Sequence, residues 1–135
     1  MKIIGLDVGD SWTGIAVSDA LGISAKPFKT VATSTLEEAL RALLQQTAIA
    51  AIVIGLPKTM RGTHSAQTDK VAAYAQQLQQ LFPDTPIHPW DERLSSQRAQ
   101  ELKPAKNKEE KLQSHAIAAA FILQSYLDYR TMQNN

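Results

Sequence analysis

Three acidic residues stand where apolar segments of the chain end. Asp7 lies near the end of "KIIGLDV" (residues 2–8), and Asp91 and Glu92 follow "PIHPW" (residues 86–90). If both segments are parallel strands of one sheet, their carboxyl ends meet at one edge, where such folds bind ligands. Carboxylates in a partly dry cleft repel each other, and a hard divalent cation relieves that repulsion. The pattern therefore predicts a magnesium or manganese site, although a turn at Asp7 and a helix start at "DER" would explain these residues without chemistry.

The composition is that of one folded domain. The chain has 135 residues, 44% of them hydrophobic, and we expect residues 1–135 to form a single domain. No apolar run approaches the ~20 residues of a membrane helix, and the first residues show no secretory signal pattern. The absence of cysteine excludes disulfides and thiolate metal sites and suits a reducing cytoplasm.

Positive charge is concentrated in the last third of the chain. The net charge is +1, whereas residues 93–135 contain seven Lys or Arg against four Asp or Glu. Such a segment can hold a polyanion beside a metal site. The alternative interpretation is a solvated, lysine-rich loop.

Apolar periodicity and turn residues predict an alternation of strands and helices. The predicted strands are residues 2–8, 14–19, 22–32, 49–57 and 86–90. The first two form an antiparallel hairpin, and Pro27 interrupts the third or confines it to an edge. Ser34 or Thr35 is expected to cap a helix; further helices are expected at about 66–81, shortly after "DER", and at about 110–129. This order predicts a mixed sheet with helices packed on its faces.

Four segments together resemble one known family. They are "GLDVGDSWTGIAVSD", "IVIGLPKTMRGTHSAQT", "WDERLSSQRA" and "AAAFILQSYLD", and they extend from residue 5 to residue 128. In this order they are similar to the YqgF family, RNase H-like proteins related to RuvC-type Holliday junction resolvases. The resemblance implies an α/β, RNase H-like fold, with a five-stranded mixed sheet, its first three strands antiparallel, flanked by helices. It also implies a metal-dependent nuclease that hydrolyses phosphodiesters.

The resemblance assigns two of the site carboxylates. The first-strand aspartate of the family is Asp7, and the acidic pair after the fifth strand is Asp91 and Glu92. Adjacent residues of an extended segment point to opposite sides, so one member of the pair is expected to enter the site. We favour Glu92, because RuvC-like relatives place a glutamate at that strand end. Asp91 would then be a supporting or capping residue.

At the third family position this chain departs from the pattern. The family has an aspartate on the last helix, nine residues before the glutamine of "ILQ", and here that residue is His115. A neutral imidazole nitrogen can replace a carboxylate ligand, but it brings no negative charge and suits manganese better than magnesium. His115 could instead shuttle a proton to the leaving group, or it could be a hydrogen-bonded histidine on the apolar stripe of the helix.

The opening turn also departs from the family. A basic pair is typical near positions 11 and 12, where this chain has Ser11 and Trp12. Trp12 could stack on a base or pack against the sheet edge. Phosphate binding is therefore expected from Lys58 and Arg61, in the loop after the fourth strand, and from Arg93.

The resemblance implies a role in ribosome biogenesis. We expect a hydrolase that uses Mg²⁺ or Mn²⁺ to process the 5′ end of pre-16S rRNA, with Asp7, Glu92 and His115 as catalytic residues and metal ligands. The expected partners are nucleic acid, with precursor rRNA preferred over branched DNA, and ribosomal particles. No membrane partner is expected, and the chain would be a monomer or a weak homodimer.

Other classes of protein stay open at this point. Holliday junction resolution would require a dimer to cut two strands symmetrically. A nucleic-acid-binding module that has lost catalysis would explain His115. The segment "DVGDSWTG" (residues 7–14) also resembles the first phosphate loop of sugar kinases and actin-like ATPases, but those proteins need two such domains, and 135 residues supply one.

Overall fold

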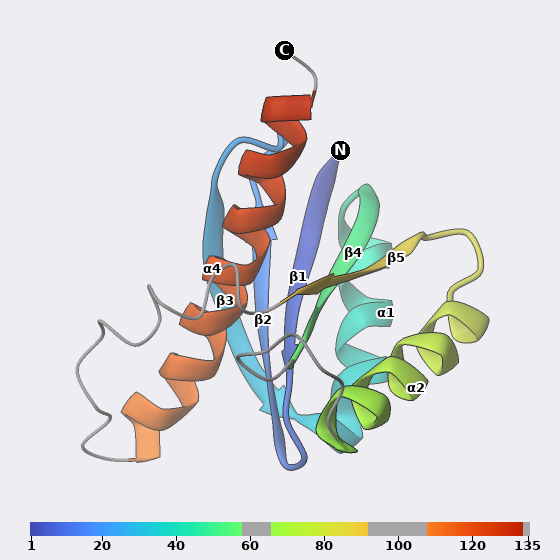
Figure 1. The fold of residues 1–135 in the computed structure, drawn as a ribbon, viewed down its shortest axis with the longest axis vertical. Coiled ribbons are helices and arrows are strands. Elements are labelled where there is room, and N and C mark those ends of the chain that lie inside the picture. Colours follow the sequence, from blue (N-terminus) through green and yellow to red (C-terminus); the bar gives the residue numbers. More distant parts are fainter. Residues whose placement is uncertain (58–65, 92–107, 134–135) are drawn as a thin grey trace.

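A central sheet carries helices on both faces (Figure 1). The structure, a computed structural model, describes residues 1–57, 66–91 and 108–133, and for residues 108–113 it describes the backbone alone. The strands are β1 (Lys2–Val8), β2 (Trp12–Ser18), β3 (Ala25–Ala32), β4 (Ile49–Leu56) and β5 (Ile87–Asp91). The helices are α1 (Leu36–Gln46), α2 (Ala66–Leu81) and α4 (Lys108–Gln133), and a 3₁₀ turn, η1 (Thr33–Thr35), leads into α1.

The sheet is mixed, with strand order β3-β2-β1-β4-β5. β1 pairs antiparallel with β2, and β2 antiparallel with β3. β4 is parallel to β1, and β5 is parallel to β4. This topology confirms the predicted five-stranded sheet whose first three strands are antiparallel. It also brings the carboxyl ends of β1, β4 and β5 to one edge.

β3 begins later than predicted, at Ala25 rather than at residue 22. The Asp19 carboxylate accepts hydrogen bonds from the backbone N–H groups of Ile23 and Ser24, at 2.7 and 3.3 Å. These bonds lower the pKa of Asp19, the bond from Ile23 most of all. The turn held by this side chain takes up the residues that the apolar pattern had assigned to the strand.

The predicted side-chain cap of α1 is wrong. Thr35 precedes the helix, but no side-chain capping hydrogen bond is present there. The Thr35 hydroxyl donates to the carbonyl oxygen of Ala32 at 2.8 Å instead. The chain enters α1 through η1, which turns this hydroxyl back along the chain and away from the helix N-terminus.

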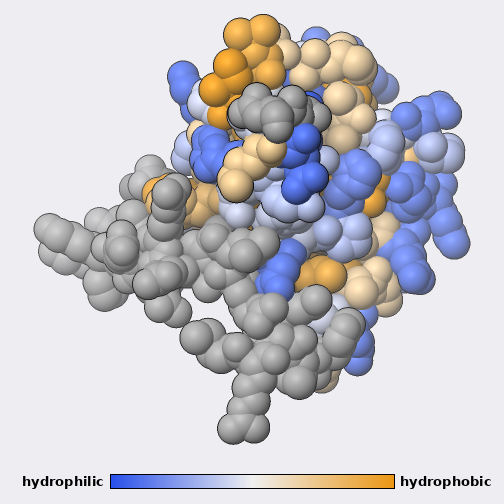
Figure 2. Space-filling view, turned by 45° about the horizontal axis from the view of Figure 1, so that its top comes forward, coloured by the Kyte–Doolittle hydropathy of each residue, from blue (hydrophilic) through white to orange (hydrophobic). Residues whose placement is uncertain are grey.

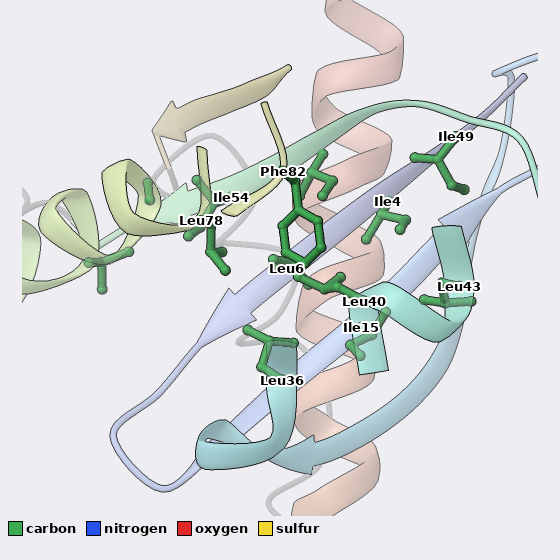
Figure 3. Packing of buried hydrophobic residues seen from close by; sticks show 13 residues of the cluster. Ile4, Leu6, Ile15, Leu36, Leu40, Leu43, Ile49, Ile54, Leu78 and Phe82 are labelled. Atoms are coloured by element: carbon green, nitrogen blue, oxygen red, sulfur yellow. The ribbon is translucent and has the colours of Figure 1, made fainter. Parts of the chain in front are cut away.

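One face of the sheet is covered by α1 and α2, and large aliphatic side chains fill the interface. Figure 3 shows Leu36, Leu40 and Leu43 of α1 pointing toward the strands, with Phe82 close by. The other buried members are Ile4, Leu6, Ile15, Ile49, Ile52, Ile54, Val71, Ala75 and Leu78. Interdigitation of these side chains holds the helices away from the strand backbones.

The other face is covered by α4, which runs antiparallel to β1 (Figure 1). Here glycines allow the helix to approach closely. A Cβ added to Gly5 would lie 2.6 Å from the Cβ of Leu123, and one added to Gly55 would lie 2.6 Å from Cδ1 of Ile122. This second core consists of Ile3, Ala16, Ala51, Val53, Ala119, Ile122, Leu123 and Leu127.

The surface mixes polar and apolar residues. Figure 2 shows hydrophobic residues gathered at the top of the view and hydrophilic ones over its right side. In the described parts of the chain, the exposed large hydrophobic residues are Met1, Leu21, Ile23, Phe28, Leu81, Tyr129 and Met132. Among the described residues, no helix has the length and apolar character needed to cross a membrane.

Candidate metal centre

Asp7 lies at the carboxyl end of β1 and faces α4. Side chains alternate along a strand, and a Cβ at Gly5 would meet Leu123 of α4, whereas Leu6 belongs to the core under α1 and α2. The Asp7 side chain is 20% exposed. The carboxylate is therefore accessible from solvent and lies at the predicted edge of the sheet.

His115 is brought to Asp7 by the glycine that pairs with Asp7. Gly14 of β2 is the partner of Asp7 in the register of the hairpin. A Cβ at Gly14 would lie 1.9 Å from the His115 carbonyl oxygen, so the helix backbone rests directly on β2. In this position His115 Nδ1 lies 3.8 Å from Oδ2 of Asp7. A residue that is distant in sequence thus meets the first-strand carboxylate.

The two side chains are electrostatically coupled. The neighbouring Asp7 carboxylate raises the pKa of His115, and partial burial of the imidazole opposes this shift. At 3.8 Å the two atoms are too far apart for a direct hydrogen bond, so the protonated form is an ion pair. A cation that binds Nδ1 must displace this proton, because a metal ligand uses the neutral imidazole.

The two atoms are close enough to be bridged by one cation. Two ligand bonds of ~2.1 Å can span at most ~4.2 Å, and the Nδ1 to Oδ2 distance of 3.8 Å falls within this limit. Within the described parts of the chain, no group of three or more His, Cys, Asp or Glu residues is arranged to hold a metal. Two ligands alone would leave the remaining coordination positions of a cation to water or to other groups.

Asp91 is not brought together with Asp7. Trp90 Nε1 donates to the Ser125 hydroxyl of α4 at 3.1 Å, so the indole faces α4. Alternation then turns Asp91 to the opposite face of the sheet, opposite Leu56 in the register. The expectation that Asp91 would not be a direct ligand stays a prediction. Glu92 lies outside the described residues.

The predicted phosphate-binding residues also fall outside the described ranges. This applies to Lys58, Arg61 and Arg93, and to the helix expected after "DER". Trp12, which replaces a basic residue of the family, is described. It lies two residues before Gly14 on β2. Its side chain is therefore on the same face of the sheet as that of Asp7, the face covered by α4.

A network of hydroxyl groups holds the turn between β1 and β2, and it was not predicted from the sequence. The Thr33 hydroxyl donates to the Gly9 carbonyl oxygen at 2.7 Å and lies 2.9 Å from the hydroxyl of Thr13. The Thr33 N–H donates to the Ser11 carbonyl oxygen at 3.0 Å. Thr13 is fully buried, and a polar residue inside an apolar hairpin was the available signal.

Comparison with known protein families supports one assignment. The family model described as "RuvX: Holliday junction resolvase" matches residues 1–129. A protein of Desulforamulus reducens named "Putative pre-16S rRNA nuclease" is 38% identical, over 95% of this chain and 97% of its own. A protein of Desulfitobacterium hafniense with the same name is 40% identical, over 99% of this chain and 96% of its own.

Among solved structures, the chain is similar to RuvC of Thermus thermophilus in complex with a Holliday junction substrate. The TM-score is 0.64 and the sequence identity 15%, over 98% of this chain and 96% of that one. At this identity the similarity concerns the fold alone. It confirms the predicted RNase H-like architecture of the RuvC type.

Proposed function

The chain belongs to the RuvX family, also called YqgF, and from this premise we propose that it is a metal-dependent nuclease that processes the 5′ end of pre-16S rRNA. The observation that carries the proposal is the approach of His115 to Asp7 at the carboxyl edge of the sheet. The names of the full-length relatives support the RNA substrate. Residues 1–135 would act as a single nuclease domain, together with ribosomal particles in the cytoplasm.

Asp7, Glu92 and His115 are the proposed catalytic residues. Bound Mg²⁺ or Mn²⁺ would supply charge stabilisation and a water nucleophile at neutral pH. Asp7 offers an anionic oxygen from the rigid end of β1, and His115 offers Nδ1 from α4. Glu92 is proposed as the third ligand, because it is the acidic residue that directly follows β5 in the sequence and RuvC-like relatives place a glutamate at that strand end.

Lys58, Arg61 and Arg93 are proposed to bind the phosphates of the substrate. Lys58 and Arg61 belong to the sequence between β4 and α2, and Arg93 is two residues after β5, and both strands have their carboxyl ends at the edge where Asp7 lies. A guanidinium group can hold a phosphate with two parallel hydrogen bonds. These residues would take over the contacts that a basic pair at positions 11 and 12 makes in the family.

A second candidate function is cleavage of branched DNA. The description of the RuvX family as Holliday junction resolvases favours it. Symmetric cleavage of a junction needs two sites, so this function predicts a dimer in solution. Sedimentation of the protein with and without junction DNA separates it from an RNA-processing monomer.

The test of the proposed function is cleavage by Asp7→Asn. Wild-type protein should cut a precursor 16S rRNA fragment in the presence of Mn²⁺ or Mg²⁺, and Asp7→Asn should lose ~10²-fold or more of this activity. A four-way DNA junction is assayed in parallel. Equal cleavage by Asp7→Asn, with its fold shown intact by circular dichroism, would contradict the assignment of the site.

A further inference from the structure

A pocket lies on the face of the sheet opposite to the one that Asp7 faces, at the same edge of the sheet. It has a volume of about 380 Å³ and lies between the β1–β2 turn, η1 and α2. Its wall includes Val8, Gly9 and Asp10, which directly follow Asp7 in the chain. Asp7 faces α4, so the pocket and the proposed metal centre lie on opposite sides of one short turn. A ligand that crosses this turn could reach both.

Side chains of α2 form one wall of the pocket at helical spacing. They come from Gln67, Lys70, Val71, Tyr74 and Gln77. The wall combines an aromatic ring, amide groups and one ammonium group. Pockets of this size with a few convergent polar groups are the usual form of small-ligand sites. Of these groups, burial raises the pKa of the Tyr74 phenol, and the charge of Glu37 adds to this effect, so the hydroxyl stays protonated.

The rim of the pocket carries an ion pair. Lys70 Nζ lies 2.8 Å from Oδ1 of Asp10, and the two side chains are 66% and 65% exposed. An ion pair this exposed contributes little to stability, so a ligand can replace either contact at small cost. The rim thus offers one cation and one anion, side by side, beside the aromatic wall.

This arrangement has the chemistry of a ribonucleotide unit. A phosphate oxygen would accept from the Lys70 ammonium, and a ribose 2′-hydroxyl would donate to the Asp10 carboxylate, as acidic residues commonly accept from ribose. A base would contact the Tyr74 ring, because every base has a face that stacks on aromatic side chains. Gln67 and Gln77 can donate to and accept from the base edge.

We propose that the pocket between the β1–β2 turn and α2 binds one unpaired ribonucleotide of the RNA strand whose scissile phosphate lies at Asp7. The proposal rests on the proposed function for its substrate. It assigns RNA recognition to Asp10, since the 2′-hydroxyl is what distinguishes RNA from DNA at a given position. Lys70 would bind the backbone of either nucleic acid.

The test is binding without cleavage. Fluorescence anisotropy is measured in EDTA with a labelled single-stranded RNA and a DNA of the same sequence. Wild-type protein should bind the RNA about 10-fold more tightly than the DNA, and Asp10→Ala should reduce this ratio to about one by weakening only the RNA complex. Asp84→Ala, an exposed aspartate in the turn before β5, is the matched control and should keep the ratio.

Two further variants separate the other contacts. Lys70→Ala should weaken RNA and DNA binding equally and reduce the salt slope by about one phosphate contact. Arg41→Ala, an exposed cation of α1, should leave both affinities unchanged. Tyr74→Phe keeps the ring and should retain affinity, whereas Tyr74→Leu should lose ~10-fold for both nucleic acids.

The outcomes distinguish this proposal from the nuclease proposal. If wild-type protein shows no RNA preference, or if Asp10→Ala leaves the ratio unchanged or weakens RNA and DNA equally, the ribonucleotide pocket is wrong. Metal-dependent cleavage that Asp7→Asn abolishes would still stand in that case. An RNA preference that depends on Asp10, without cleavage under any metal condition, would support the pocket and overturn the nuclease.

Discussion

The two faces of the sheet are packed by different means. Under α4, glycines bring helix and strand backbones together, most closely where Gly14 meets the carbonyl oxygen of His115. Under α1 and α2, leucine and isoleucine side chains separate the helices from the strands, and a pocket of about 380 Å³ opens where these side chains end. On one face the backbone of α4 touches the strands, whereas the face covered by α1 and α2 leaves room for a pocket.

This difference matches what each face is proposed to do. A cation requires its ligand atoms within a few tenths of an ångström, and backbone contact is a direct way to fix α4 relative to β1. A nucleotide requires room and tolerates adjustable side chains such as Lys70 and Gln77. The following substitutions break or sharpen this comparison.

The largest effect is expected from Gly14→Ala. The added Cβ would lie 1.9 Å from the His115 carbonyl oxygen and 2.2 Å from its carbon. Because both are backbone atoms, α4 must shift, and we expect a loss of about 4 kcal/mol in the free energy of unfolding, measured in urea. Gly22→Ala is the control. Gly22 has a φ of +71°, and a Cβ added there would meet no atom within 4 Å, so we expect a loss of about 1–2 kcal/mol from the backbone conformation alone. Equal losses would contradict the role of backbone contact.

Leu40→Ala tests the aliphatic face. Leu40 is fully buried between α1 and the sheet (Figure 3), and its truncation should cost about 3 kcal/mol. The Asp7–His115 pair lies on the other face, so the NMR signals of the His115 ring should stay in place. A shift as large as that in Gly14→Ala would show that the two faces are not independent.

His115→Asp restores the family carboxylate and should tighten the cation site. Two carboxylates repel each other until a cation binds, so we expect about 10-fold higher Mg²⁺ affinity by calorimetry, or about 1.4 kcal/mol. His115→Asn, which adds no charge, is the control. Lower Mg²⁺ affinity in His115→Asp than in the wild type would argue against position 115 as a ligand.

The smallest effect is a pH dependence of stability without metal. The pKa of His115 is raised in the folded state by Asp7. The ion pair therefore stabilises the folded state fully at pH values below the ordinary histidine pKa of about 6.5. This contribution to stability is lost as the pH rises through the raised pKa of His115. Asp7→Asn in EDTA should cost more at pH 5.5 than at pH 8.5, by less than about 1 kcal/mol because the pair is partly exposed. A larger loss of stability at pH 8.5 than at pH 5.5, measured by urea unfolding, would contradict the ion pair.

Local patterns in the sequence were sufficient for most of the fold. Apolar runs located β1 and β4, and helical spacing located α2 over its full length. The approach of position 115 to Asp7 followed from the family resemblance, because counting from Gln124 identified the residue. These features depend on near neighbours or on a shared motif.

Features that depend on individual side-chain hydrogen bonds, between near or distant residues, could not be predicted from the sequence. The start of β3 was misplaced because the Asp19 side chain holds a turn, and the cap at Thr35 was wrong because its hydroxyl donates to Ala32. The pocket rim joins Asp10 to Lys70, 60 residues away. The apolar periodicity of the sequence does not indicate a contact between two such distant residues.

The most direct test of the account is whether Asp7 and His115 hold one cation. Mn²⁺ is titrated into protein with labelled histidine while the ring signals are followed by NMR. The His115 signals should broaden at substoichiometric Mn²⁺, before those of the exposed His88 on β5, and Asp7→Asn should require at least about 10-fold more Mn²⁺. Broadening of His115 that is unchanged in Asp7→Asn, or no faster than that of His88, would contradict the central claim.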